Sequence, residues 1–390
     1  MSEIRVDTIS EKTSGSGTTV SNLKNPNNTF RNKFCNGDFQ VHQRFDGSAT
    51  AASTAYMSFD RIKTLLINTG AAWTVEKETL SVTDLATTGH KQAMEVKCTT
   101  ADTSTGAAEY NAVFFSLEAN SLQDLNYGTS AAKSLTVSFW VRSYQTGTFV
   151  LTAAKSDSTT YYNPKEYTIN ASNTWEHKTL TYAPTAGGTS LITSSNGVIN
   201  NDNGQGMHFY FMLNAGSNYH ATNDTWATSG IATSNQTNMM SSTDNHWSIT
   251  GLQIEAGDQA TDFEYIPFDI QLQRCQRYFE KSYDLSVVPG TSAAYDGTIL
   301  AAVIADGTTT RIVGNDMRFA VRKRTEPSVT IYATDDGTSG EINNYSSGAN
   351  KTISSIGNIS ETSIGRYFTM SDAGATNEQY EFQFKADAEF

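Results

Sequence analysis

The feature that most constrains this chain is a series of short segments in which apolar and polar residues alternate. Within residues 135–142, Leu135, Val137, Phe139 and Val141 fall on one face of an extended chain. This period of two is typical of a half-buried β-strand. The same kind of segment, bounded by Gly, Asn, Asp and Ser clusters, recurs at 73–76, 93–97, 113–117, 149–151, 175–180, 208–213 and 247–254. Because no helical pattern lies among these strands, the sequence predicts an all-β, two-sheet sandwich.

A short helix is predicted after the last of these strands. Residues 255–258 have turn chemistry, Pro267 biases the residue before it away from helix, and Asp269 is expected to cap the helix. Four residues share one face at helical spacing: Leu272, Cys275, Tyr278 and Phe279. Four charged residues are expected to point to water: Arg274, Arg277, Glu280 and Lys281. An amphipathic helix of about three turns is therefore expected.

The C-terminal part has its own strand pattern. Predicted strands cover residues 298–304, 317–322, 328–332, 366–370 and 379–386, with Gly-Asn-Ser loops between them. We expect a second, smaller β-sandwich of about one hundred residues, which is a common domain size. The predicted organisation is an N-terminal segment (1–30), a sandwich domain (31–268), a helical connector (269–283) and a C-terminal sandwich domain (284–390).

The N-terminal segment alternates at Ile4, Val6 and Ile9 and then becomes rich in Ser, Thr and Gly. An isolated strand cannot bury its own apolar face, so these three residues are predicted to contact another protein or another copy of this chain. The alternative is a frayed terminus.

Composition excludes several classes of protein. The formal charge of −13 argues against nucleic acid as a partner, and no polybasic segment indicates an anionic membrane. The N-terminus has no apolar signal region, and no run of apolar residues is long enough to insert in a membrane. Cys35, Cys98 and Cys275 are too few and too scattered for a disulfide framework, which favours assembly in a reducing cytosol. A role outside the cell would then follow from lysis rather than from secretion.

Residues at both borders of the sandwich match a known pattern. The matching residues are Asn36-Gly37-Asp38-Phe39-Gln40-Val41, Phe59-Asp60-Arg61, Gln253-Ile254-Glu255-x-Gly257, Ala260-Thr261-x-Phe263-Glu264 and Cys275-Gln276-Arg277-Tyr278-Phe279-Glu280-Lys281. In this order they resemble the borders of a jelly-roll domain, similar to carbohydrate-binding modules, in bacteriophage tail fibres and related appendages. The resemblance covers roughly residues 34–283. Asp262 stands where these proteins often carry proline, which is expected to loosen the segment without changing the topology.

The resemblance extends to both ends of the chain. The opening residues look like the N-termini of phage appendage proteins, which anchor the fibre to the particle. Arg318-Phe319-x-Val321-Arg322 and Phe382-x-Phe384-x-Ala386 resemble the C-terminal β-domain that often follows the jelly roll. The resemblance implies a homotrimer that assembles in the host cytoplasm, joins a tail or other virion protein, and contacts host cell-surface glycans.

Motifs of catalysis are absent from the sequence. It contains no G-x-S-x-G, P-loop, G-x-G-x-x-G or H-E-x-x-H motif, and its six histidines lack metal-ligand spacing. The protein is therefore predicted not to be an enzyme and to need no cofactor. Resemblance to carbohydrate-binding modules leaves a structural calcium near Asp38 or Asp258 conceivable, with ordinary surface carboxylates as the alternative.

Glycan-binding candidates come from aromatic residues in polar loops. A sugar stacks its C–H faces on aromatic rings and hydrogen-bonds its hydroxyls to polar side chains. One candidate loop carries Tyr219, Asp224 and Trp226, and another carries Tyr161 and Tyr162. In the alternative, Trp226 plugs a sheet edge and Tyr219 lies flat on the sandwich.

A cationic candidate lies further along the chain. Arg318, Arg322 and Arg324 could share one strand face and bind an acidic sugar, with a solvated face as the alternative.

Three functions remain open. The first is a tail-fibre or receptor-binding protein that contacts host glycans. The second is a purely structural virion appendage that binds no glycan. The third is a polysaccharide depolymerase, against which the absence of a solenoid repeat argues.

Overall fold

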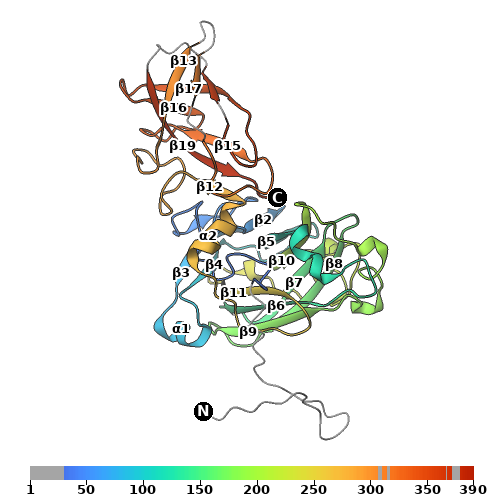
Figure 1. The fold of residues 1–390 in the computed structure, drawn as a ribbon. Coiled ribbons are helices and arrows are strands. Elements are labelled where there is room, and N and C mark those ends of the chain that lie inside the picture. Colours follow the sequence, from blue (N-terminus) through green and yellow to red (C-terminus); the bar gives the residue numbers. More distant parts are fainter. Residues whose placement is uncertain (1–29, 306–309, 314–316, 366, 371–377) are drawn as a thin grey trace, which may run out of the picture.

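Two β-units with a short helix between them make up the described chain (Figure 1). The computed structural model describes residues 30–305, 310–313, 317–365, 367–370 and 378–390. The predicted contact residues Ile4, Val6 and Ile9 lie outside the described residues. Among the helices described, none is long and apolar enough to cross a membrane.

The first unit, here called the N-terminal sandwich, consists of two antiparallel sheets. One sheet has the spatial order β1 (Thr50–Ala51), β3 (Ala72–Thr79), β4 (Gln92–Thr100), β11 (His246–Ala256), β6 (Leu135–Ser143) and β9 (Glu176–Tyr182). The other has the order β2 (Lys63–Ile67), β5 (Tyr110–Glu118), β10 (Gln205–Ala215), β7 (Gly147–Lys155) and β8 (Tyr161–Ile169). The all-β jelly-roll sandwich expected from the sequence is confirmed.

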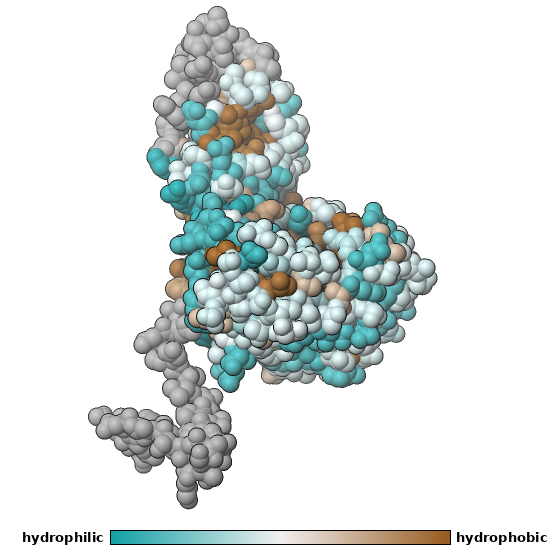
Figure 2. Space-filling model, turned by 90° about the vertical axis from the view of Figure 1, so that its right-hand side faces the viewer, coloured by the Kyte–Doolittle hydropathy of each residue, from teal (hydrophilic) through white to brown (hydrophobic). Residues whose placement is uncertain are grey.

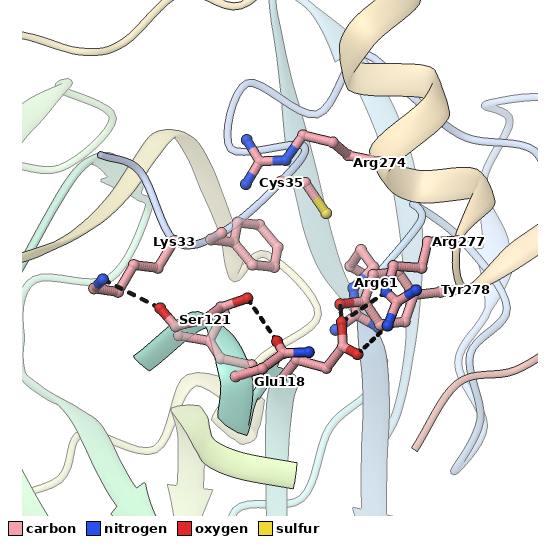
Figure 3. A pocket seen from close by; sticks show the side chains of 11 residues that line it. Lys33, Cys35, Arg61, Glu118, Ser121, Arg274, Arg277 and Tyr278 are labelled. Atoms are coloured by element: carbon pink, nitrogen blue, oxygen red, sulfur yellow. Dashed lines mark hydrogen bonds and ion pairs between the residues drawn. The ribbon is translucent and has the colours of Figure 1, made fainter. Parts of the chain in front are cut away.

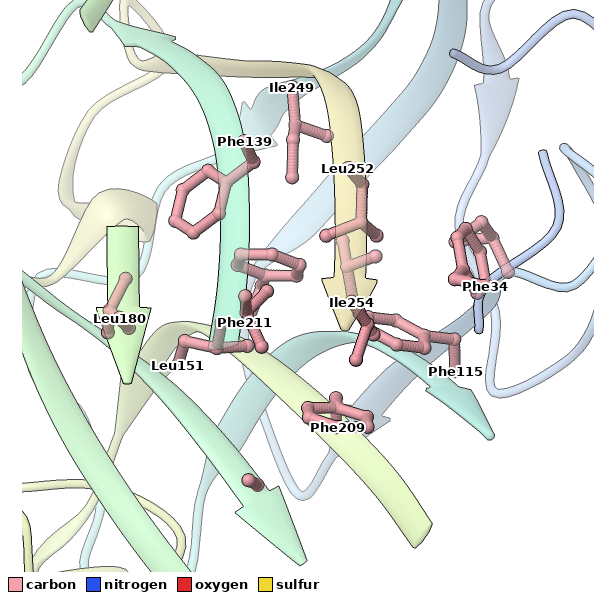
Figure 4. Close-up of a cluster of buried hydrophobic side chains, with 14 of the residues drawn as sticks. Phe34, Phe115, Phe139, Leu151, Leu180, Phe209, Phe211, Ile249, Leu252 and Ile254 are labelled. Atoms are coloured by element: carbon pink, nitrogen blue, oxygen red, sulfur yellow. The ribbon is translucent and has the colours of Figure 1, made fainter. Parts of the chain in front are cut away.

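Alternating apolar residues from both sheets build the core of this sandwich (Figure 4). Leu135, Val137, Phe139 and Val141 of β6 are all completely buried, as their spacing predicts. Phe139 meets Phe211 of the facing sheet edge-on, with ring centroids 5.0 Å apart. Aromatic pairs in such geometry stabilise a core beyond the area that they bury.

A helix that the sequence analysis missed lies between β3 and β4. It is α1 (Val82–Thr88), and it begins at a capping box in which the Ser81 hydroxyl accepts from the Asp84 backbone N–H and the Asp84 carboxylate accepts from Ser81. Gly89 ends the helix in the left-handed conformation, with φ of 80°. The remaining helical turns are short: η1 (Ala119–Leu125), η2 (Ala186–Gly188), η3 (Ser195–Gly197), η4 (Ser217–Tyr219) and η5 (Met239–Ser241).

The helix predicted for residues 269–283 is shorter than expected. It is α2 (Phe268–Gln276), and Pro267 rather than Asp269 occupies the N-cap position. The next residues form strand β12 (Phe279–Lys281), because their backbone pairs with the strand β19 (Gln379–Asp387). The prediction that Glu280 and Lys281 point to water is wrong, since both are buried where β12 joins that strand.

The second unit, here called the C-terminal unit, is a single sheet that closes on itself. Its strands beyond β12 are β13 (Ile299–Ala305), β14 (Thr310–Val313), β15 (Ser328–Tyr332), β16 (Glu341–Asn344), β17 (Asn350–Gly357), β18 (Tyr367–Met370) and β19. β19 pairs with β13 on one side and with β16 on the other. Phe368 of β18 meets Phe382 of β19 edge-on at 4.9 Å, although the two strands are not neighbours. The sheet therefore folds over a core of its own, as expected for a second, smaller sandwich.

The sequence analysis misplaced part of this unit. It missed β14, β16 and β17, and it predicted a strand at residues 317–322 where the structure has one isolated bridge, between Arg318 and Ser363. The strand pairing expected at residues 317–322 is interrupted, because the backbone N–H of Ala320 donates to the Glu280 carboxylate, at 2.9 Å. The domain boundaries drawn from the sequence stay a prediction.

Buried charges join the two units. The Glu389 carboxylate, from the end of the C-terminal unit, is paired with Arg61 and Arg44 of the N-terminal sandwich. Arg44 also pairs with Asp60, at 3.1 Å. The Arg61 guanidinium lies 3.4 Å from the centroid of the Tyr278 ring and donates to the Ser116 carbonyl, at 2.6 Å. These contacts tie the residues that follow α2 and β19 to the sandwich.

We predict that Arg61→Met destabilises the folded protein far more than Arg322→Met does. The Arg61 side chain is only 2% exposed, so its loss leaves Glu389 as a buried charge with one partner fewer, at a cost of about 3–5 kcal/mol. Arg322 pairs with Glu361 at the surface, with its side chain 71% exposed, and its removal should cost at most about 1 kcal/mol. Urea unfolding of both variants measures the difference. Equal losses would contradict a structural role for the buried network.

Candidate functional site

A cavity of about 360 Å³ opens between the end of α1 and the extended segment that follows β11. Its lining residues come from three separate parts of the chain: Asp38, Gln40, Leu85, Gly89, His90, Lys91, Gln92 and Tyr265. The left-handed turn at Gly89 ends α1, and His90, which follows it two residues before β4, is buried. We call this cavity the Tyr265 pocket.

Tyr265 supplies an aromatic ring that is open to solvent. Tyr265 as a whole residue is 60% exposed, and its hydroxyl donates to the Gly89 carbonyl at 2.7 Å. Phe263 meets the ring edge-on, with centroids 5.0 Å apart. The ring is therefore held in place at its edge and its hydroxyl while most of its surface stays accessible.

His90 lies below this ring, almost completely buried. Its Nδ1 atom is buried and has no hydrogen-bond partner in the described part of the chain. Burial lowers the pKa of His90 to about 4, and the nearby charge of Asp38 opposes this effect. A side chain at Gly251 of β11 would bring its Cβ to 2.5 Å from the His90 Nε2 atom. The glycine therefore makes room for a neutral imidazole.

Carboxylate and amide groups complete the lining. Asp38 is 4% exposed, and its carboxylate accepts hydrogen bonds from the side chains of Gln40 and Gln271. Gln92 donates to the Phe39 carbonyl, while Gln40 and Lys91 reach solvent. Of the described residues that line the pocket, Asp38 is the single carboxylate. The arrangement suits recognition of a polar ligand with one apolar face.

The sequence-predicted residues lie elsewhere, and the structure divides them. Trp226 is 1% exposed within the core of the sandwich, where its indole N–H donates to the Ala183 carbonyl at 2.8 Å. Tyr161 is buried in the same core. Neither ring offers a face to a ligand in this structure, and the Trp226 ring lies in the core of the sandwich rather than at the surface of a polar loop.

Tyr162 and Tyr219 are half-buried on the outer face of the five-stranded sheet. They belong to one apolar cluster with Tyr110, Phe114 and Tyr210. Tyr219 meets Tyr110 edge-on, at 4.8 Å between ring centroids. The structure thus brings together two predicted residues that are far apart in sequence, and their role in glycan binding stays a prediction.

Asp224 is held in an ion pair. Its carboxylate is 2.8 Å from the Lys165 Nζ atom, and its backbone N–H donates to the Pro164 carbonyl at 2.8 Å. These contacts hold the loop that carries Asp224 against β8. The Asp224 carboxylate is therefore only partly available to a ligand.

The three arginines considered for an acidic sugar do not form one face. Arg322 pairs with Glu361 at the surface. Arg324 instead donates to the carbonyls of Ala388 and Glu389, both at 2.8 Å, and its guanidinium lies over the Phe390 ring. The prediction that these arginines share one strand face is wrong, because residues 317–322 do not form a strand.

The calcium hypothesis is not strengthened by the geometry. The described residues contain no group of three or more His, Cys, Asp or Glu side chains that could hold a metal ion. Asp38 is engaged by two amide donors, and Asp258 lies in an exposed bend after β11.

The sequence analysis missed the Tyr265 pocket. Its signal was the spacing of Phe263 and Tyr265, which places both rings on one side of an extended chain, where both contact His90. Because α1 was also missed, no argument from the sequence could bring Gly89 and His90 beside Tyr265.

Comparison with known proteins gives a limited result. No known protein family matches the sequence, and no curated protein matches it. Solved structures similar in fold include the enzymatically active domain of bacteriophage CBA120 tailspike protein 4, at 10% identity and a TM-score of 0.28, covering 58% of this chain and 21% of the tailspike chain. This chain therefore spans about a fifth of that structure's length.

Two other similar structures are smaller proteins. A putative sugar binding protein from Bacteroides thetaiotaomicron has 9% identity and a TM-score of 0.30, with 58% of this chain and 99% of that chain covered. The family 11 carbohydrate-binding module of a Clostridium thermocellum cellulase has 12% identity and a TM-score of 0.27, with 55% and 97% covered. At TM-scores below 0.5 these likenesses do not bear on the site or its chemistry.

We predict that the protein loses stability as the pH falls below about 6.5, before most carboxylates titrate. Burial lowers the pKa of His90 and of His208 to about 4 in each case, from an ordinary value of 6.5. Between these values the unfolded chain binds more protons than the folded one, so the free energy of unfolding decreases with falling pH, by up to about 1.4 kcal/mol per pH unit for each histidine.

Urea unfolding between pH 7.5 and 5 checks this dependence. His90→Phe keeps a ring of similar size and removes one titrating group, so its free energy of unfolding should depend less on pH than that of the parent protein. If the free energy of unfolding depended on pH equally in both proteins, His90 would not be one of the groups that cause the dependence.

Proposed function

We propose that this chain is a structural protein of a bacteriophage tail fibre or receptor-binding appendage, and that it contacts host surface glycans through the Tyr265 pocket. The observation that carries glycan binding is the exposed Tyr265 ring beside a buried polar atom, His90 Nδ1, that lacks a partner among the described residues. The phage role rests on the resemblance of residues 34–61 and 253–281 to appendage proteins.

The chemistry of the pocket suits a sugar. An exposed, fixed aromatic ring can stack on the C–H face of a pyranose without losing much conformational freedom. The Nδ1 atom of neutral His90 is a donor in one tautomer and an acceptor in the other. A sugar hydroxyl both donates and accepts, so it can satisfy this atom in either tautomer. Gln40 and Lys91 at the solvent side add further hydrogen-bonding groups.

The lining favours binding over hydrolysis. Glycoside cleavage generally uses two carboxyl groups on opposite sides of the scissile bond. In the described part of the chain, the Tyr265 pocket has only Asp38, whose carboxylate already accepts from two glutamine amides. A non-enzymatic role is therefore proposed, and the depolymerase hypothesis has no pair of carboxylates here to support it.

The second candidate function is a purely structural virion appendage. The buried charge network between the units favours it, because a rigid junction suits a spacer whether or not a glycan is bound. In either case we propose a homotrimer in the virion, assembled in the host cytoplasm and joined to a tail or other virion protein through its N-terminal segment.

We predict that Tyr265→Ala weakens glycan binding by about twofold to tenfold, because stacking on an aromatic ring contributes about 0.5–1.5 kcal/mol. An array of bacterial surface polysaccharides, followed by titration of the bound glycan, measures this loss. Tyr345→Ala is the matched control, since Tyr345 is 63% exposed on the C-terminal unit. Trp226→Ala is a poor test, because removing this buried ring would disrupt the core.

The array also separates the two candidate functions. Specific binding that depends on Tyr265 favours the receptor-binding function. Absence of binding to every glycan on the array and to intact host cells favours the structural appendage. Glycan affinity that is the same in Tyr265→Ala as in the parent protein would show that the glycan binds outside the Tyr265 pocket.

A further inference from the structure

A second cavity, of about 210 Å³, lies between α2, the segment 33–35 and the start of η1 (Figure 3). Four cationic side chains line it: Lys33, Arg61, Arg274 and Arg277. Glu118 is the single carboxylate among its described lining residues. This excess of positive charge is unusual in a chain whose formal charge is −13. We call this cavity the arginine pocket.

Three of the four cations already have strong partners. Arg61 is paired with Glu389, and Lys33 lies 2.6 Å from the Asp124 carboxylate. The Arg277 guanidinium donates to both carboxylate oxygens of Glu118, and its Nε atom lies 2.8 Å from Oε2. The Tyr278 hydroxyl donates to the same Glu118 oxygen at 2.8 Å. Glu118 is therefore fully engaged and cannot neutralise another cation.

Arg274 is different, because no carboxylate pairs with it in the described part of the chain. Its Nη2 atom donates only to the Asn32 carbonyl, at a long 3.3 Å. Its Nη1 atom is buried and has no hydrogen-bond partner. In Figure 3 the Arg274 side chain reaches from α2 across the cavity, on the side away from Glu118. A buried donor of a charged group that lacks a partner destabilises the folded protein.

We propose that the arginine pocket binds a small oxyanion, the carboxylate or phosphate group of a ligand, with Arg274 as its anchor. A guanidinium can bind such a group through two parallel hydrogen bonds, and the free Nη1 atom supplies one of them. Lys33 and the polar residues Asn120 and Ser121 line the same cavity. The assignment does not depend on glycan binding at the Tyr265 pocket, which has a different lining.

The position of the site gives the anion a structural effect. Arg274 belongs to α2, which connects the two units, whereas Lys33, Asn120 and Ser121 belong to the N-terminal sandwich. An anion held by both sides would stabilise the attachment of α2 to the sandwich. Binding to the folded state alone raises the free energy of unfolding with ligand concentration.

Titration of the whole protein with inorganic phosphate and, separately, with galacturonate tests the proposal, at constant ionic strength set by sodium chloride. Galactose serves as the uncharged control. Calorimetry and thermal unfolding should show saturable binding of at least one anion, tighter than any binding of galactose. Binding of phosphate alone identifies a phosphate group as the ligand chemistry, binding of galacturonate alone identifies a carboxylate, and binding of both identifies a general oxyanion site.

Two variants locate the site. Arg274→Gln should raise the Kd at least tenfold, because it removes the anchoring charge and keeps a polar side chain. Lys33→Gln should raise it by a smaller factor, and it provides a second test if Arg274→Gln does not fold. Arg322→Gln is the matched control, since Arg322 lies at the surface of the C-terminal unit, and should bind as the parent does. Absence of saturable binding of either anion, or equal affinity in the parent and in Arg274→Gln, would overturn the proposal.

Discussion

The fold depends on charges that are buried between its two β-units. Arg61 and Arg44 belong to the N-terminal sandwich, and their partner Glu389 follows the last strand of the C-terminal unit. Ions removed from water are costly unless they are paired and hydrogen-bonded, so each side of this junction needs the other. A second buried pair, Lys323 with Glu280, fixes the segment after β14 against β12. Lys323 and Glu280 both belong to the C-terminal unit, so the pairs that cross between the units are those of Glu389 with Arg44 and Arg61.

Both cavities lie where this junction or the adjoining segments bring distant residues together. The Tyr265 pocket joins the segment after β11 to the end of α1, and the arginine pocket joins α2 to the start of the sandwich. Elsewhere, the face shown in Figure 2 is mostly polar, with an apolar patch on the C-terminal unit. The two cavities have different chemistry, because one offers an exposed ring with polar groups that include one cation and one carboxylate, and the other is lined by four cations and one carboxylate.

The sequence was informative about the sandwich and less so about the connections. Its strands were predictable because residues such as Val137 and Phe139 obey the two-residue period of a sheet with one face in the core. The end of α2 was not, because Phe279–Lys281 continues the helical spacing and becomes a strand only by pairing with β19, about a hundred residues later. The strand expected at 317–322 failed for a similar reason, since a side chain from β12 takes the backbone donor of Ala320.

The candidate ligand-binding residues show the same contrast between what the sequence predicts and what only the fold decides. Aromatic residues in polar loops marked Trp226 as a ligand-binding candidate, yet its ring fills the core. Nothing local distinguishes a tryptophan that binds a sugar from one that packs under a loop, since both need an apolar surface and one hydrogen bond. Tyr265 directly follows the matched residues Phe263-Glu264, and nothing local shows that its ring is exposed.

Taken alone, the sequence determined the all-β class, the two-sheet sandwich and the place of the short helix, because these follow from local periodicity and turn chemistry. Only the tertiary structure decided that the Tyr265 ring is exposed, that Arg274 has no carboxylate partner among the described residues, and how the two units join. Those properties depend on contacts between residues far apart in the chain, and burial alone changes a charged or aromatic side chain from a surface group into a structural one.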